Sequence, residues 1–154
     1  MSGGTPRRTV VIDADACPRG AVETVRRLQP GFGYQVLTVA SVNHVIEPWG
    51  PWHEHAVVDA GPQAADLAVA NAARAGDVVV TQDWGLAALV LAKGCRAVSP
   101  GGYTFRPEAV DLLLEERHVK AKVRRAGGRT RGPRARSRED EERFEKALRA
   151  ALRA

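Results

Sequence analysis

The sequence has few cysteines, few aromatic residues and no long apolar run. It contains two cysteines, Cys17 and Cys95, and its aromatic content is 5%. Two cysteines this far apart do not form a disulfide framework, and the N-terminus lacks the charged and apolar segments of a secretory signal. The apolar run from Leu86 to Ala92 is far shorter than the roughly 20 residues of a membrane-spanning helix. We therefore expect a cytoplasmic protein without a membrane span.

Acidic residues are missing from one stretch of the chain. No Asp or Glu lies between Arg117 and Arg138, in a chain whose net charge is +5. The stretch is rich in glycine and holds eight basic residues: Lys120, Lys122, Arg124, Arg125, Arg129, Arg131, Arg134 and Arg136. Such a composition fits a solvated linker or a surface that contacts a phosphate backbone. On the second interpretation, the predicted partner is a nucleic acid, bound by Arg124, Arg125, Arg129 and Arg131.

The remaining sequence predicts one α/β domain, and 44% hydrophobic residues are enough to form its core. Strands are predicted at Thr9–Ile12, Tyr34–Ala40, Ala56–Val58, Val78–Thr81 and Arg96–Ser99. Helices are predicted from Pro18 onward, at Ala64–Ala75, at Leu86–Lys93 and from about Pro107 to Glu116. Helices alternating with strands that are apolar throughout indicate a mostly parallel sheet covered on both faces. The expected fold is a three-layer α/β/α arrangement.

Beyond this domain the sequence predicts one more helix. The expected organisation is a flexible start at 1–8, the α/β domain at 9–117, the basic segment at 118–138 and a C-terminal helix at 139–154. Ser137 is the predicted N-cap, with Asp140 three residues on. The apolar stripe of this helix consists of Phe144, Ala147, Leu148, Ala151 and Leu152. We expect the stripe to dock on the domain or on a second copy of the chain, so a homodimer is one expectation.

Aspartates occur where the predicted strands end. Asp13 and Asp15 follow the first strand, Asp83 follows the fourth, and Asp66 lies near the start of the alanine-rich helix. Ligands of open α/β sheets bind outside the carboxyl ends of the strands, and carboxylates gathered there repel one another unless a cation intervenes. Oxygen ligands select a hard ion, Mg²⁺ or Mn²⁺. The alternative for each acid is a helix N-cap or a turn, which we favour for Asp59 after the third strand.

Other polar residues add weaker candidates. Ser41, Asn43 and His44 follow the second strand and are predicted to line the same rim, where they would bind phosphate or orient water. The alternative is a loop whose side chains cap its own backbone groups. Cys17 and Cys95 are interpreted as buried packing residues rather than nucleophiles.

The segment His53-Glu54-His55 would place two imidazoles on one side of an extended chain. Such a pair could bind zinc, but no cysteine or third histidine lies close to it in the sequence. We favour the interpretation of a surface loop beside Trp49 and Trp52.

Six segments form a distinctive ordered set along nearly the whole chain: 12–18 (IDADACP), 41–44 (SVNH), 64–66 (AAD), 76–83 (GDVVVTQD), 85–88 (GLAA) and 127–133 (GGRTRGP). Together they resemble the YaiI/YqxD family of uncharacterised bacterial proteins. This resemblance implies a PIN-like fold, in which a few acids at the carboxyl end of a parallel sheet hold Mg²⁺ or Mn²⁺ for RNA cleavage.

Carried over by position, the resemblance assigns Asp13, Asp66 and Asp83 to the catalytic, metal-binding site, with Asp15 as an accessory ligand. Gln63 departs from the pattern, because an acid is expected two residues before the pair Ala65-Asp66. An amide oxygen carries no charge, so this departure indicates either a weaker metal affinity or a position that is not a metal ligand.

Three functions follow from these features. The first is a metal-dependent nuclease acting on RNA. The second is a phosphatase with Asp13 as nucleophile and Asp15 as general acid, for which the sequence lacks a convincing lysine and a late acidic pair. The third is a nucleic-acid-binding module without catalysis, in which residues 117–138 bind the ligand; Gln63 favours this alternative.

Overall fold

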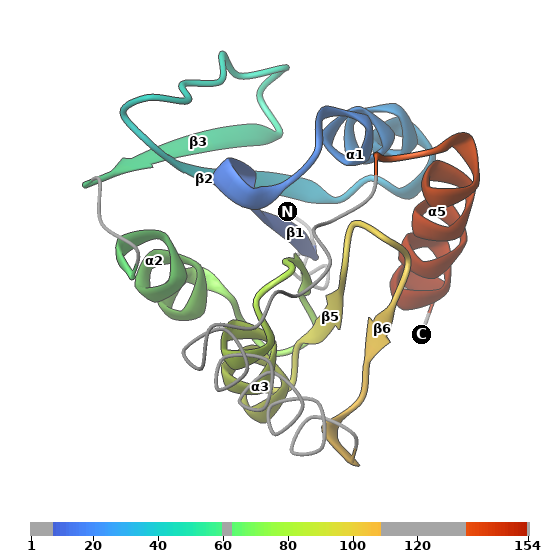
Figure 1. Cartoon of the computed structure of the whole chain (residues 1–154). Helices are drawn as coiled ribbons and strands as arrows, with labels where there is room; N and C mark the ends of the chain where they lie inside the picture. Colours follow the sequence, from blue (N-terminus) through green and yellow to red (C-terminus); the bar gives the residue numbers. More distant parts are fainter. Residues whose placement is uncertain (1–7, 60–62, 109–134, 154) are drawn as a thin grey trace, which may run out of the picture.

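The computed structural model describes residues 8–59, 63–108 and 135–153, and these form an α/β fold around a six-stranded sheet (Figure 1). The strands are β1 (Thr9–Asp13), β2 (Gln35–Ser41), β3 (His53–Val58), β4 (Val78–Val80), β5 (Arg96–Val98) and β6 (Thr104–Phe105). Their spatial order is β3-β2-β1-β4-β5-β6. All neighbouring pairs are parallel except β5 and β6, which are antiparallel. The predicted mostly parallel sheet is confirmed.

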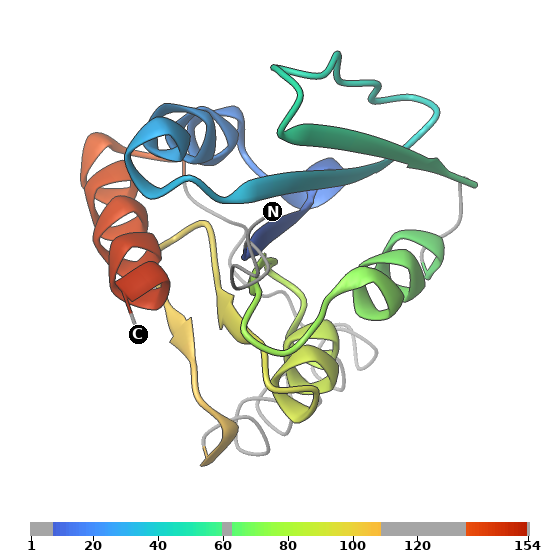
Figure 2. The same cartoon turned by 180° about the vertical axis from the view of Figure 1, so that it is seen from behind.

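Helices cover both faces of the sheet (Figures 1 and 2). They are η1 (Ala14–Ala16), α1 (Arg19–Phe32), α2 (Ala64–Ala72), α3 (Trp84–Ala92) and α5 (Arg138–Arg153). Val10 and Ile12 of β1 pack in the core that includes α1 and α5, while Val11 packs in the core formed with α2 and α3. Successive residues of a strand point to opposite faces, so a central strand between two apolar layers must be apolar throughout.

Helix α5 docks on the domain, which is one of the two arrangements predicted for its apolar stripe. Phe144 and Leu148 are fully buried in the core that includes α1. The predicted N-cap is also confirmed, because Ser137 N donates to Asp140 Oδ2 (2.9 Å) and Asp140 N donates to Ser137 Oγ (3.2 Å). These reciprocal bonds satisfy groups at the helix start that would otherwise lack partners.

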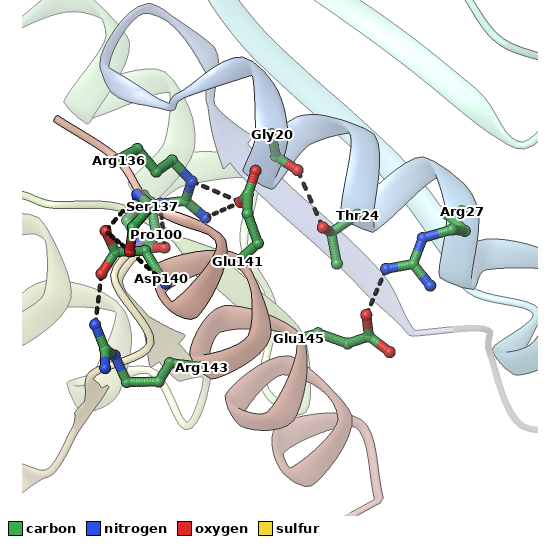
Figure 3. A network of polar contacts seen from close by, with 10 residues as sticks. All are labelled: Gly20, Thr24, Arg27, Pro100, Arg136, Ser137, Asp140, Glu141, Arg143 and Glu145. Carbon is green, nitrogen blue, oxygen red and sulfur yellow. Dashed lines mark hydrogen bonds and ion pairs between the residues drawn. The ribbon is translucent and has the colours of Figure 1, made fainter.

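Polar contacts also join α5 to α1. Arg27 and Glu145 form an ion pair between the two helices (Figure 3). Gly20 of α1 leaves room for the side chain of Glu141 from α5, since a Cβ atom built at Gly20 would lie 1.6 Å from Glu141 Oε2. The C-terminal helix is therefore an integral part of the domain and closes one side of its core.

Two element boundaries differ by three residues from those predicted, and one strand was not predicted. Strand β3 begins at His53, three residues before the predicted start, because the first half of the strand, His53-Glu54-His55, is polar and carries no apolar strand signal. Helix α2 ends at Ala72 rather than Ala75. The short strand β6 was not predicted, since its pairing depends on a turn and not on an apolar run. The helix predicted from Pro107 lies largely outside the described residues.

The order of the strands places a topological switch point between β1 and β4. The chain leaves β1 through α1 on one face of the sheet and reaches β4 through α2 on the other face. At such a switch point the two connections diverge, and the carboxyl ends of the two strands stay accessible between them. Within the described part of the chain, no helix is long and apolar enough to cross a membrane.

Candidate functional site

The switch point places two of the predicted acids at neighbouring strand ends. Asp13 is the last residue of β1, where Ile12 pairs with Val80, the last residue of β4. The chain then continues from β4 through Thr81 and Gln82 to Asp83. Asp13 and Asp83 therefore lie at or just after the ends of the two strands that flank the switch point.

Asp83 also begins helix α3. Its Oδ1 accepts a hydrogen bond from Leu86 N (2.9 Å), and its own backbone N donates to Thr81 Oγ1 (3.0 Å). The N-cap role considered as an alternative for each acid is thus real for Asp83. A carboxylate has two oxygens, so capping with one of them is compatible with a function of the other at the rim.

Asp15 connects the rim to the end of β2. It lies in η1, and its Oδ2 accepts a hydrogen bond from Ser41 N (2.8 Å). His44 Nδ1 lies 3.6 Å from Asp15 Oδ1. In the same turn, His44 N donates to Ser41 O (3.0 Å) and Asn43 N donates to Ser41 Oγ (3.4 Å). The structure thus brings Ser41, Asn43 and His44 beside Asp15, with Ser41 also capping its own turn.

Asp66 reaches the rim from the other side of the sheet. It lies half-buried in the first turn of α2, a helix that packs against β1. Gln63 is the N-cap residue of this helix and makes no side-chain capping bond. Asp59 is exposed after β3, and it does not hold the N-cap position that its place in the sequence suggested.

The four aspartates interact electrostatically. Asp13 is only 7% exposed, and its pKa is raised from 3.8 to about 6. Burial is the main cause, followed by the charges of Asp66, Asp15 and Asp83. Both causes disfavour the ionised carboxylate: low polarity does so by desolvation and the neighbouring acids by repulsion. Residues from β1, η1, α2 and the β4–α3 connection thus share one electrostatic environment.

The raised pKa predicts that Asp13→Asn stabilises the protein at neutral pH. Below about pH 4, Asp13 is protonated in both folded and unfolded chains. Between pH 4 and 6 only the folded chain keeps the proton, so stability falls as pH rises, by about 3 kcal/mol. Thermal unfolding without divalent cations should show Asp13→Asn melting several degrees above the unmodified protein at pH 7.5 and at a similar temperature at pH 4. A difference that does not depend on pH would contradict this prediction.

The donor set at this rim suits a hard cation, since all four side chains offer carboxylate oxygens. Within residues 8–59, 63–108 and 135–153, however, no three His, Cys, Asp or Glu side chains form a group already arranged to hold a metal ion. One oxygen of Asp83 and one of Asp15 are held by backbone N–H groups. Binding a cation would therefore require the carboxylates to turn toward one another.

The histidine pair has a structural role that the sequence reading missed. His53 Nε2 and His55 Nδ1 lie 2.8 Å and 2.7 Å from Thr38 Oγ1. Trp49 N donates to His53 Nδ1 (2.9 Å) and Ile46 N to His55 Nε2 (3.3 Å), so each ring must be neutral and direct its single N–H toward Thr38.

Burial is the main cause that lowers the pKa of His53 to about 4, in agreement with its neutral form. The predicted surface loop is therefore wrong for His53, which is buried in β3. The pair instead ties the 42–52 connection to the sheet.

Both cysteines are buried and free, as predicted. Burial raises the pKa of Cys17 to about 12 and also raises that of Cys95. The thiolate is the reactive form, so neither residue has the environment of a nucleophile. The four predicted RNA contacts Arg124, Arg125, Arg129 and Arg131 lie outside the described residues.

Gln82 lies at the rim, although the sequence assigned it no role in the site. Its side-chain Nε2 donates to Ala16 O (2.8 Å), which joins the β4–α3 connection to η1. The signal was the pair Thr81-Gln82, two polar residues that follow an apolar strand. The bond from Gln82 to Ala16 could not be predicted, because the two residues lie far apart in the sequence.

Comparison with known proteins identifies the family. The family model described as "Uncharacterized BCR, YaiI/YqxD family" matches residues 11–154. A "UPF0178 protein" of Heliobacterium modesticaldum is 49% identical over 144 residues, covering 94% of this chain and 96% of that protein. Proteins of the same name from Exiguobacterium sibiricum and Clostridium tetani are 42% and 38% identical, covering 89% and 88% of this chain and 91% and 90% of their own lengths. No solved structure matches the sequence. The chain belongs to the YaiI/YqxD family of uncharacterised proteins.

Proposed function

We propose that the protein is a metal-dependent nuclease that hydrolyses phosphodiester bonds in RNA. The observation that carries the proposal is that the charges of Asp15, Asp66 and Asp83, from three other elements, act on the buried Asp13 at the switch point of a parallel sheet. Capping of α3 gives Asp83 a structural role, but it does not explain why three acids act on the carboxylate of Asp13. The resemblance to PIN-like nucleases points to the same chemistry.

In this proposal Asp13, Asp66 and Asp83 hold Mg²⁺ or Mn²⁺, and Asp15 assists. The bound cation supplies an activated water and stabilises charge on the leaving oxygen. Asp13 is the central member, because it is the most buried of the four and feels the charge of the other three. Ser41, Asn43 and His44 extend the site along β2, where their polar groups would contact the phosphate.

The phosphatase alternative fits the geometry less well. It needs Asp15 as a protonated general acid, whereas Asp15 Oδ2 accepts a hydrogen bond from Ser41 N and Oδ1 lies near His44. Both oxygens of Asp15 are thus engaged by groups at the end of β2.

Metal binding predicts a rise in melting temperature. Mn²⁺ that binds only the folded chain stabilises it by about 2.7 kcal/mol when its concentration is 100 times the Kd. For a chain of this size, that corresponds to several degrees. Differential scanning fluorimetry should show this rise in the unmodified protein and its loss in Asp13→Asn.

The matched control is Asp59→Asn. This variant removes an exposed acid that follows β3 but is not among the charges acting on Asp13. It should keep the full response to Mn²⁺. An equal rise in melting temperature in the unmodified protein, Asp13→Asn and Asp59→Asn would mean that the ion binds elsewhere, and it would contradict the proposed metal site.

A further inference from the structure

A pocket opens beside the acidic rim, at the carboxyl ends of β4 and β5. Its volume is about 610 Å³, which lies in the usual range of small-ligand sites, roughly 300–1,000 Å³. The residues that matter for its chemistry are Gln82, Trp84, Ser99, Tyr103, Phe105 and Arg136. They come from the start of α3, the β5–β6 turn and the approach to α5.

The pocket and the acidic rim share a wall. Gln82 lines the pocket, and the residues on either side of it, Thr81 and Asp83, belong to the rim. The bond from Gln82 Nε2 to Ala16 O holds this wall against η1, which carries Asp15. A chain-like ligand could therefore place one group in the pocket and a neighbouring group at the acids.

Aromatic side chains give the pocket its character. Tyr103 is 42% exposed, and its ring meets the buried ring of Phe105 edge to face, with centroids 5.2 Å apart. Trp84 lies half-buried on the α3 side. An aromatic ring with an exposed face is a platform on which a flat group can stack.

The β5–β6 turn holds Tyr103 in place. Ser99 N donates to Tyr103 O (2.8 Å), and Tyr103 N donates to Ser99 Oγ (3.0 Å). Gly102 has a φ of +92°, and a Cβ atom there would lie 2.7 Å from the backbone carbon of Arg143. The turn is thus specified by both conformation and space, so Tyr103 is positioned before any ligand arrives.

The charge of the pocket disfavours a phosphate. Among the described residues that line it, Arg136 carries the only positive charge. Its Nε donates to Glu141 Oε1 (2.6 Å) and its Nη1 to Pro100 O (2.6 Å), as Figure 3 shows. This guanidinium is paired with Glu141, and the one acidic lining residue among those described, Asp140, is paired with Arg143. With its charges already paired, the pocket suits a flat, uncharged group.

We propose that the pocket binds one unpaired nucleobase of an RNA strand whose adjoining phosphate lies at the acidic rim. The inference rests on the nuclease function proposed above and names its substrate class, single-stranded RNA. The base stacks on Tyr103, while the Ser99 hydroxyl and the Gln82 amide contact its polar edge. A base within a duplex is already stacked and paired, so double-stranded RNA is excluded from this site.

The test moves one abasic position along a short labelled RNA and measures affinity by fluorescence anisotropy. Asp83→Asn serves as the parent protein, because it removes turnover during the measurement. When the abasic site is at the nucleotide whose base enters the pocket, binding should weaken at least about fivefold. Adding Tyr103→Ala should erase this dependence, while Tyr103→Phe, which keeps the ring, should preserve it. Melting temperatures verify that both variants fold.

The inference is overturned by an affinity profile that is flat along the strand, by a dependence that persists in Tyr103→Ala, by equal binding of duplex RNA or by no binding at all. Cleavage assays in the presence of Mn²⁺ separate this failure from failure of the nuclease proposal. Metal-dependent cleavage together with a flat affinity profile would contradict only the proposed base pocket. An affinity profile that depends on Tyr103, without any cleavage, would contradict only the proposed nuclease function.

Discussion

Asp83→Asn should abolish Mn²⁺-dependent cleavage of single-stranded RNA, with a fall in rate of at least about a hundredfold. The substitution removes one negative charge from the rim and so weakens the hold on the catalytic cation. It leaves helix α3 intact, because asparagine is as good an N-cap as aspartate and its amide oxygen can still accept from Leu86 N. The measurement is the initial rate on a labelled RNA at saturating Mn²⁺.

Two variants make this experiment decisive. Asp59→Asn removes an acid after the edge strand β3 and should retain full activity. Asp83→Ala should lose activity as well and in addition about 1 kcal/mol of stability, since its cap is gone. RNA affinity in Asp83→Asn should be equal or higher, because phosphate meets less repulsion. Cleavage that survives in Asp83→Asn at near its normal rate would refute the assigned role of this residue.

The second large effect concerns the basic segment. Changing Arg124, Arg125, Arg129 and Arg131 together to glutamine should weaken RNA binding at least about tenfold near 0.1 M salt. Each phosphate contact on a single strand contributes about −0.7 to the slope of log affinity against log salt, so the slope should become shallower by about 3. Fluorescence anisotropy over a salt series measures both quantities.

Net charge alone could also weaken binding, and a second fourfold variant controls for it. Arg19, Arg74, Lys146 and Arg153 are exposed and spread over the domain, and changing them to glutamine lowers the net charge equally. This control should retain most of the affinity and the steep salt dependence. If both variants behave alike, or the slope does not change, residues 118–138 act as a solvated linker and not as the RNA-binding surface.

Much of the fold could be predicted because its signals are local. The apolar run Val78–Val80 predicts a strand buried on both faces, and the spacing of Ser137 and Asp140 predicts the start of α5. The prediction was less accurate for strands with few consecutive apolar residues: β3 begins earlier than expected, and β6 was not predicted. The pairing of an edge strand depends on neighbours distant in the sequence rather than on its own residues.

The candidate site divides in the same way. The sequence by itself determined that aspartates follow the strands, since that requires only the position of each acid relative to an apolar run. It could not decide which of these acids meet. Asp13 and Asp59 have similar local sequence contexts, yet Asp13 ends the central strand β1 and feels three other carboxylates, while Asp59 follows the edge strand β3.

Tertiary structure alone decided which of the acids act on one another. It also decided that Gln82 bonds to Ala16 and that Thr38 contacts two histidines. Each of these contacts joins residues from different elements, and their proximity follows from the order of strands in the sheet. That order is set by the burial of whole apolar faces and by the handedness of the connections between parallel strands. These are properties of the complete chain, and no short segment of the sequence carries them.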